Sequence, residues 1–448
     1  MDTEYYSKQI LFKNMSKFCP DVADSLIEFS NSSINDYANY IWSKVLLSDS
    51  KISQNSRSHL YNVLFNEVEE QLDFSHANEA LAEFIKIPVL QTGPHCQLLV
   101  ERSRFYSAIF SLIGLNSIGH KYCFLENCST VSFTEKANTG PGWITFHDTS
   151  INVFGLSRRT LLKSSVYAYN APLSFELNPT LGKIKINKIN LLLKELKELI
   201  GSEKFNSATK AFNKANHTLW RSWDKFKEFY PIFLDEYFFV KLLLSHLSDS
   251  NSIVYRILND CNYYNKILSN IKDEAKLPTG SKIPHQTEFF WTIRKKKIHA
   301  LVINDGKIFN ENHIDELCFD FNITNIKKGL KEGILIPDAF MIILMLSILP
   351  NVRIVGGSRQ IAYYSPFQRV FMDILNEKND DELGLKEYLQ KNFNSAWGAT
   401  VLDENEDVSD LLIDYPSGQQ LEFLIKKFSQ QSLVSTTKKF KILNQSFC

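Results

Sequence analysis

Two glycine-containing bends carry the polar side chains best suited to bind or transfer a charged group. In the first bend, Gln91, Thr92 and Gly93 follow an apolar run and precede His95 and Gln97. A strand that ends in a glycine turn and opens a helix presents free backbone N–H groups and the positive end of the helix dipole, and anions bind there. A histidine at that point can donate to a phosphate or carboxylate, or transfer a proton. We therefore expect these five residues to surround an anionic ligand.

The second bend lies much later in the chain and combines paired glycines with an arginine. The apolar run VRIV leads into Gly356 and Gly357, and an amphipathic stretch follows them. Glycines allow a ligand to approach the backbone closely, and an arginine can bind a carboxylate or phosphate in a bidentate way. The residues expected to bind or orient substrate here are Gly356, Gly357, Ser358, Arg359, Gln360 and Tyr363.

Each bend also has a plain structural interpretation. The first lacks GxGxxG and GxxxxGK[ST] and could be only a helix start capped by Thr92, whereas the second lacks the GxSxG frame and could be only a tight turn. A Cys96 nucleophile with His95 or His147 would make the protein a thiol hydrolase. However, adjacent residues on a turn rarely face each other, and no orienting Asn or Asp is identifiable.

Two further patterns are weaker. His120, Cys123 and Cys128 have a spacing that a metal could use, but no second pair completes a tetrahedral set, so we expect structural cysteines and no metal site. The basic run from Arg294 to Lys297 could clamp a polyanion, although a solvated strand edge is the simpler interpretation.

Composition limits the function classes. The chain has 448 residues, enough for roughly two to three domains, and its 50 basic and 50 acidic side chains cancel. This balance removes the broad positive field of non-specific nucleic-acid binding, so no nucleic-acid partner is expected. The N-terminus lacks a signal-like segment and the longest apolar run, 339–349, is too short to cross a bilayer, which predicts a cytoplasmic protein without a membrane partner. The seven scattered cysteines do not suggest a disulfide framework.

The hydrophobic pattern predicts an α/β protein. The N-terminal region 1–86 has helical periodicity. Strand patterns at 85–91, 120–126, 142–156 and 162–170, with a helix over 97–115, predict that 87–182 is the first part of an α/β core. Helical periodicity returns in 183–275, which we interpret as a helical insertion. The second part of the core, 276–375, combines a hairpin around Asn304–Gly306, a helix over 337–349 and a strand over 352–355. The C-terminal extension 376–448 contains a weak hairpin pattern over 411–425.

Taken in order, these segments resemble the bacillithiol-biosynthesis cysteine-adding enzyme family. The stretch 91–109 is similar to the family's TGQQ-type turn and the helix after it, and 289–309 is similar to its strand pair around an Arg and an Asp-Gly turn. The most specific similarity is to the family's GGPGEIAYW motif, matched at Gly356, Gly357, Ile361, Ala362 and Tyr363. The resemblance covers roughly residues 85–375.

The resemblance implies a Rossmann-like, nucleotide-binding-type core and a ligase that joins the carboxyl group of cysteine to the amine of glucosaminyl malate. It makes ATP or another nucleotide the candidate cofactor, and an amino acid and a small-molecule amine acceptor the candidate ligands. In this ligase His95 would transfer protons, Arg359 would bind a carboxylate, and Gln360 and Tyr363 would orient substrate.

The chain also departs from the family pattern. Gln360 stands where the motif has Glu, Ser358 and Arg359 replace Pro-Gly, and Pro94 and His95 fall where the first motif has Gln-Gln. The tail beyond Phe371 is too short for the family's C-terminal coiled coil. A degenerate member that binds a nucleotide or a protein partner without catalysis is therefore the alternative to a ligase.

Overall fold

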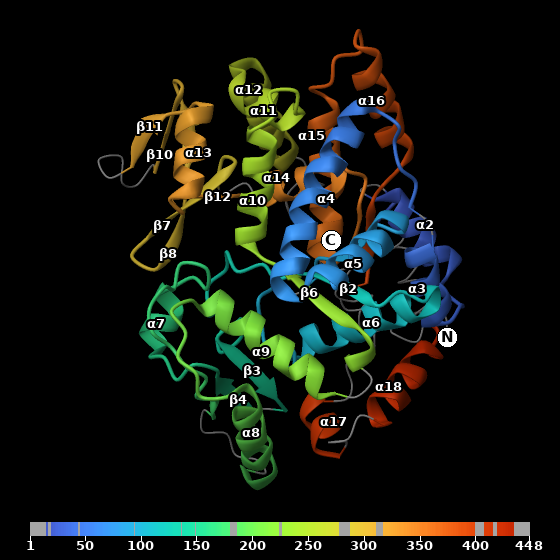
Figure 1. The fold of residues 1–448 in the computed structure, drawn as a ribbon, viewed down its shortest axis with the longest axis vertical. Helices are drawn as coiled ribbons and strands as arrows, with labels where there is room; N and C mark the ends of the chain where they lie inside the picture. The colour runs from blue at the N-terminus through green and yellow to red at the C-terminus, as the bar shows by residue number, and fades with distance from the viewer. Residues whose placement is uncertain are drawn as a thin grey trace.

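A computed structural model describes residues 15–16, 19–43, 45–93, 95–135, 137–147, 149–179, 186–223, 226–276, 287–310, 317–398, 407–414 and 419–433. Figure 1 shows these residues arranged around a central sheet, with groups of helices and smaller sheets above and below it. The protein is thus of the mixed α/β class.

Five parallel strands form the central sheet. Their order across the sheet is β14-β13-β1-β2-β6. Starting from β1, the chain first adds β2 and β6 on one side of it and then adds β13 and β14 on the other side. The reversal lies between β1 and β13, where Gln91 pairs with Val355. The strands are β1 (Val89–Gln91), β2 (Tyr122–Glu126), β6 (Tyr230–Leu234), β13 (Arg353–Gly356) and β14 (Ser395–Trp397).

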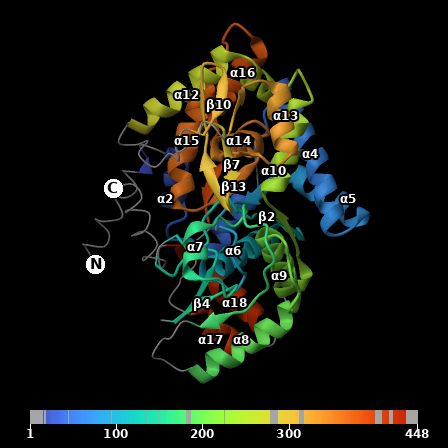
Figure 2. The same ribbon diagram turned by 90° about the vertical axis from the view of Figure 1, so that its left-hand side faces the viewer.

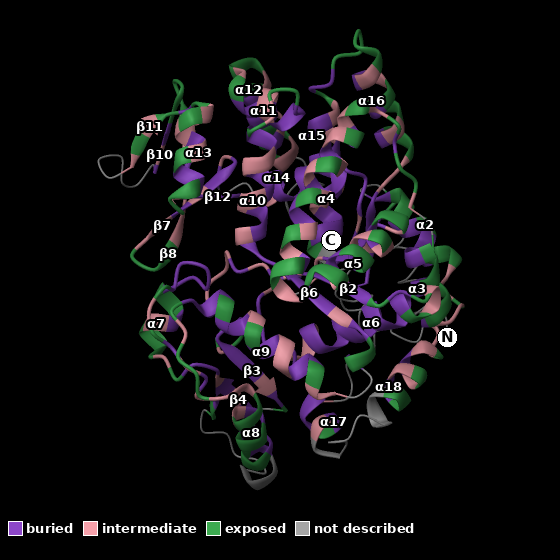
Figure 3. Ribbon diagram, viewed as in Figure 1, coloured by how far each residue is buried: buried purple, intermediate pink, exposed green. Residues whose placement is uncertain are grey.

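Helices cover both faces of this sheet because its strands are apolar on both sides. Val89 and Val355 belong to one buried cluster, whereas their neighbours Leu90 and Ile354 belong to the other. The first cluster includes side chains of α2 (Pro20–Glu28), α3 (Ile34–Ser43), α6 (Arg102–Ile118) and α9 (Ala208–Ser222). The second includes side chains of α4 (Lys51–Gln71), α5 (Phe74–Lys86), α10 (Glu236–Leu247) and most of the buried residues of α15 (Ser358–Met372). In Figure 3 the sheet strands and the helix faces against them are buried.

Smaller antiparallel sheets occupy the long connections between the core strands. The connection from β2 to β6 holds β3 (Trp143–Phe146), β4 (Thr149–Asn152), β5 (Asn178–Pro179), α7 (Arg158–Lys163), α8 (Ile186–Ile200) and the short helix η1 (Phe226–Glu228). The connection from β6 to β13 holds two three-stranded sheets. One consists of β7 (Phe290–Arg294), β8 (Lys297–Ala300) and β12 (Leu335–Pro337), and the other of β9 (Val302–Asn304), β10 (Lys307–Phe309) and β11 (Cys318–Asp320). Figure 2 shows the first of these connections below the central sheet and the second above it.

The remaining helices complete the two sides. The connection from β6 to β13 also contains α11 (Ile253–Asn259), α12 (Cys261–Lys276), α13 (Ile323–Lys331), α14 (Ala339–Ile343) and the π-helix η2 (Leu344–Ile348). Between β13 and β14 lies α16 (Asp380–Lys391), and after β14 come α17 (Val408–Asp414) and α18 (Gln419–Ser429). Among the residues described, no helix has both the length and the apolar character needed to cross a membrane.

Several sequence predictions are confirmed. Helices fill the described part of 1–86, and the strand predicted over 120–126 and the one over 352–355 are β2 and β13. The hairpin predicted at Asn304–Gly306 joins β9 to β10, and Asp305 and Gly306 both have positive φ, as a two-residue hairpin turn of this type requires. The helix predicted over 337–349 is α14 continued by η2.

Other sequence predictions are wrong. The range 183–275, interpreted as a helical insertion, contains β6, which is an edge strand of the central sheet. The strand expected over 85–91 begins only at Val89, because the preceding residues end α5, and 162–170 forms no strand beyond one isolated bridge. The hairpin pattern over 411–425 falls on α17 and α18, with 415–418 outside the described residues. The C-terminal extension 376–448 supplies β14 to the central sheet.

Candidate functional site

The two glycine bends meet at the carboxyl ends of β1 and β13. The backbone N–H of Thr92 donates to the carbonyl oxygen of Val355 at 2.8 Å, which continues the pairing of the two strands by one residue. The two bends therefore lie at one rim of the same sheet. Strand order reverses at this point, and in open α/β sheets such a reversal is where ligands bind at the carboxyl ends of the strands.

The Gln360 side chain occupies the space that Gly356 leaves empty. A Cβ added at Gly356 would lie 1.8 Å from Gln360 Oε1, so only glycine is compatible with this arrangement. The hydroxyl of Thr92 donates to the same oxygen at 2.5 Å, and Gln360 is only 5% exposed. Its Nε2 has no hydrogen-bond partner among the described residues. A buried amide donor without an acceptor is costly and indicates a place where a ligand supplies one.

This amide lies at the beginning of α15, whose first backbone N–H groups have no intrahelical acceptor. Gly357 occupies the N-cap position, and no side-chain cap is made there by the residues whose side chains are described. Ser358 opens the helix, with its side chain outside the described part. The first turn of α15 therefore offers backbone donors next to the Gln360 amide, and donors of this kind suit a carboxylate or phosphate.

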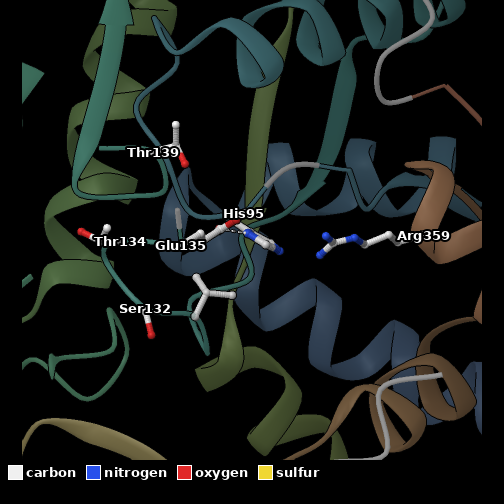
Figure 4. Close-up of a pocket in the computed structure, with 7 residues that line it drawn as sticks. His95, Ser132, Thr134, Glu135, Thr139 and Arg359 are labelled. Atoms are coloured by element: carbon white, nitrogen blue, oxygen red, sulfur yellow. Dashed lines mark hydrogen bonds and ion pairs between the residues drawn. The ribbon is translucent and has the colours of Figure 1, made fainter. Parts of the chain in front are cut away.

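A cavity of about 450 Å³ lies beside these bends. Its lining consists of His95, Val131, Ser132, Thr134, Glu135, Thr139 and Arg359. Figure 4 shows the Arg359 guanidinium pointing across the cavity toward the His95 imidazole. The cavity thereby joins residues from the first bend, from the 131–139 segment and from α15.

His95 is oriented by Glu135. Its Nδ1 lies 2.5 Å from Glu135 Oε1, and this hydrogen bond to the imidazole lowers the pKa of the Glu135 carboxyl. The nearby Arg359 charge lowers the pKa of Glu135 further, so this carboxylate is ionised at neutral pH. With Nδ1–H donated to Glu135, Nε2 of His95 is left to exchange a proton with a ligand in the cavity.

Not every residue singled out from the sequence lines this cavity. Gln91 is buried in the core, where its Oε1 accepts from the Ser111 hydroxyl at 3.3 Å. Gln97 is tied to Asn216 of α9, whose side chain donates to the Gln97 carbonyl and accepts from the Leu99 N–H. These bonds hold the 97–99 backbone outside a helix, which explains why α6 begins at Arg102 rather than at Gln97.

The remaining predicted residues lie close to the cavity or outside it. Gly93 is half-buried, and its neighbour Pro94 lies outside the described residues. Tyr363, one turn beyond Arg359 on α15, is half-buried, and burial raises the pKa of its hydroxyl. Cys96 is 0% exposed, and burial also raises the pKa of its thiol well above the usual range. A thiol with this environment is not a nucleophile at neutral pH, which argues against the thiol hydrolase.

Sequence reasoning missed the acidic side chains at this edge of the sheet. Glu135 lies in a loop and no local pattern marks it. Glu126 ends β2 and Glu236 opens α10 after β6. A signal existed for this pair, since a charged residue at or just after the end of a buried parallel strand lies at the edge where ligands bind.

Comparison with known proteins gives no family. No protein-family model and no curated protein matches the chain. In the part of the chain that the structure describes, no group of three or more His, Cys, Asp or Glu residues could hold a metal ion. The function must therefore be argued from the geometry of this site.

The buried acids predict a pH-dependent stability. Burial raises the pKa of Glu126 to about 8 and that of Asp235 to about 7, in both cases helped by the charge of Glu236. Between about pH 5 and pH 8 these two groups hold protons in the folded protein that the unfolded chain has lost, so their contribution to the free energy of unfolding falls as the pH rises. Each such group contributes a slope of up to about 1.4 kcal/mol per pH unit.

Urea unfolding at half-unit steps from pH 5 to pH 8 measures this slope. Glu126→Gln, which removes one of the raised groups, is expected to make the free energy of unfolding fall less steeply with pH than in the unsubstituted protein. Equal slopes for the variant and the unsubstituted protein would show that Glu126 is ionised in the folded state throughout.

Proposed function

We propose that the protein is a cytoplasmic ligase that joins the carboxyl group of an amino acid, cysteine by the family resemblance, to the amine of a small-molecule acceptor. The observation that carries this proposal is the buried Gln360 amide above Gly356, held by Thr92, with an unpartnered Nε2 at the start of α15. This arrangement uses both bends at once and is built to hold an anionic group.

The topology supports a Rossmann-like interpretation of the core. Numbered along the chain, the five strands lie in the order 3-2-1-4-5, and the two bends lie where that order reverses. In open α/β sheets, ligands bind in the crevice at the carboxyl ends of the strands at such a reversal. A nucleotide bound there would supply the leaving group that an otherwise unreactive carboxylate needs.

The side chains around the cavity have complementary roles in this reaction. Arg359 and the donors at the start of α15 would bind an anionic substrate group, and Tyr363 would orient it. Glu135 fixes the tautomer of His95, so that Nε2 can accept or return a proton during condensation. The cavity of about 450 Å³ has room for a small amino acid and part of an acceptor.

One observation favours the alternative, a protein that binds a nucleotide or a protein partner without turnover. Gln360 stands where the resembling motif carries an acidic residue, and a neutral amide cannot accept a proton as a carboxylate does. Binding at the crevice could persist after such a loss.

Mass spectrometry of the protein incubated with cysteine, ATP and a panel of amino sugars and peptide amines tests the proposal. We expect a condensed product from at least one acceptor, and a loss of about 100-fold in its rate for His95→Ala. His147→Ala is the matched control, because His147 is also an exposed histidine bonded to a carboxylate, at Asp410, but does not line the cavity.

Two results would contradict the ligase. A product that forms equally fast with His95→Ala would remove His95 from the reaction. No product from any acceptor, together with a melting temperature raised by ATP, would assign the crevice to binding alone.

A further inference from the structure

Three neighbouring strands bring Gly356, Thr92 and Glu126 side by side at the carboxyl edge of the sheet. Gln91 pairs with Val355 on one side and with Leu125 on the other, so the next residue of each strand continues the same row. Adjacent strands are about 4.8 Å apart, which places the Glu126 backbone within about 5 Å of Thr92.

These three residues also face the same side of the sheet. Ile354, Leu90 and Phe124 precede them by two positions and belong to one buried cluster. Because side chains alternate along a strand, Glu126 points toward the same side as Thr92, where the Gln360 amide lies over Gly356. The row therefore presents one carboxylate beside one buried amide.

The Glu126 carboxylate has no hydrogen bond or ion pair with any described residue. Arg104, whose positive charge lowers the pKa of Glu126, donates to the Glu126 backbone carbonyl at 3.0 Å. Glu236 adds negative charge, but its own oxygens accept from the N–H groups of Ser129 and Thr130. Glu126 is thus the acidic group of this edge that is left for a ligand, and because its pKa is about 8 it is partly protonated near neutral pH until a cation favours its ionised form.

Two further groups belong to the same edge of the sheet as Glu126. Gln360 Nε2 is buried without a partner, on the opposite side of the amide from the oxygen that Thr92 holds. The Tyr363 hydroxyl interacts electrostatically with Glu126, whose charge contributes to the raised pKa of that phenol. A ligand that carries both a hydrogen-bond acceptor and a cation would satisfy the amide and the carboxylate together.

We propose that Glu126 binds the ammonium group of the acceptor and removes the proton that must leave before the nitrogen can attack. The step transfers one proton from R–NH₃⁺ to the carboxylate and leaves R–NH₂ with a free electron pair, and Glu126 becomes a neutral carboxylic acid. This assignment deepens the proposed ligase and rests on it for the attack that follows. The amine-binding part does not depend on turnover.

The energetics of this transfer are nearly balanced. Burial raises the pKa of Glu126 to about 8, and primary amines next to electron-withdrawing groups, such as α-amino groups, have pKa values of roughly 7.7–8.0. A base matched to the acid that it deprotonates works efficiently near neutral pH. An ordinary surface carboxylate would be too weak a base for this proton.

Calorimetric titration at pH 7.5 with D-glucosamine as the probe tests amine binding directly, with N-acetyl-D-glucosamine as the uncharged comparison. We expect the unsubstituted protein to bind the amine in preference to the amide, and Glu126→Gln to weaken amine binding at least tenfold. Glu126→Asp keeps the charge and should retain the preference. Glu79→Gln is the matched control, because Glu79 accepts from Tyr122 at the opposite end of β2.

The possible results distinguish a failure of the amine site at Glu126 from a failure of the proposed ligase function. Unchanged glucosamine binding by Glu126→Gln would overturn the role of Glu126, whether or not the protein forms amides. Amine binding that depends on Glu126, without any condensed product, would support the amine site and contradict the proposed ligase function. Where product does form, Glu126→Gln is expected to slow it by about 100-fold while leaving ATP-induced stabilisation unchanged.

Discussion

Glu236→Ala is expected to lower the free energy of unfolding by about 3–5 kcal/mol. Glu236 is 1% exposed and is the first residue of α10. One of its oxygens accepts from the N–H groups of Ser129 and Thr130, each at 2.6 Å, and the other accepts from the Ser129 hydroxyl. Alanine would leave these buried donors without an acceptor and would remove a negative charge from the N-terminus of a helix.

The same substitution should weaken ligand binding. The segment that Glu236 anchors continues into Ser132, Thr134 and Glu135, which line the cavity. If the backbone at Ser129 loses its anchor, the carboxylate that orients His95 moves with it. Urea unfolding followed by tryptophan fluorescence measures the stability, and hydrogen exchange at 129–135 reports the loss of the anchor.

Glu236→Gln tests the hydrogen-bonding role of this side chain separately from its negative charge. Glutamine retains one oxygen for the two backbone N–H groups, so Glu236→Gln should lower the free energy of unfolding by only about 1–2 kcal/mol. A loss below about 1 kcal/mol for Glu236→Ala would mean that water replaces the carboxylate and that the segment does not depend on it.

The parts of the fold that were predictable from sequence are those with strong local signals. The Asn304–Gly306 hairpin rests on a turn that needs two positive φ angles, and the strand predicted over 352–355 rests on an apolar run that leads into paired glycines. In each case the local backbone chemistry restricts the structure to few alternatives.

The missed strand β6 shows where local signals fail. Its sequence, YPIFL, is a short apolar run between two helical segments, and periodicity cannot distinguish such a run from buried helix. Only pairing with β2, from Tyr122–Tyr230 to Glu126–Leu234, makes it a strand. For the same reason α18 was mistaken for a hairpin strand, although Leu424 and Phe428 are one helical turn apart and both are buried.

The candidate site was predictable in its anion-binding part and not in its acidic part. His95 and Arg359 were identified because glycine bends mark the backbone around them. Glu135 reaches His95 only through the loop that follows β2, and Glu126 becomes prominent only when the register places it beside Thr92. Tertiary contacts, rather than sequence spacing, assign these residues to the site.

The close packing at the end of β14 predicts a second large effect. Gly398 follows Trp397, and a Cβ added there would lie 2.3 Å from Phe110 Cε1 and 2.4 Å from Val355 Cγ1. Both neighbours are 0% exposed, so neither can move without displacing the core. Gly398→Ala is therefore expected to lower the free energy of unfolding by about 2–3 kcal/mol.

Gly384→Ala is the matched control for this substitution. Gly384 lies inside α16 with nothing within 4 Å of an added Cβ, so alanine should raise the free energy of unfolding by about 0.5–1 kcal/mol through its higher helix propensity. Urea unfolding of the two variants should therefore give changes of opposite sign. A neutral Gly398→Ala would show that Phe110 and Val355 can repack, and the crevice beside β13 would then be less rigid than a preorganised anion site requires. The sign of this one measurement thus bears on the site as well as on the core.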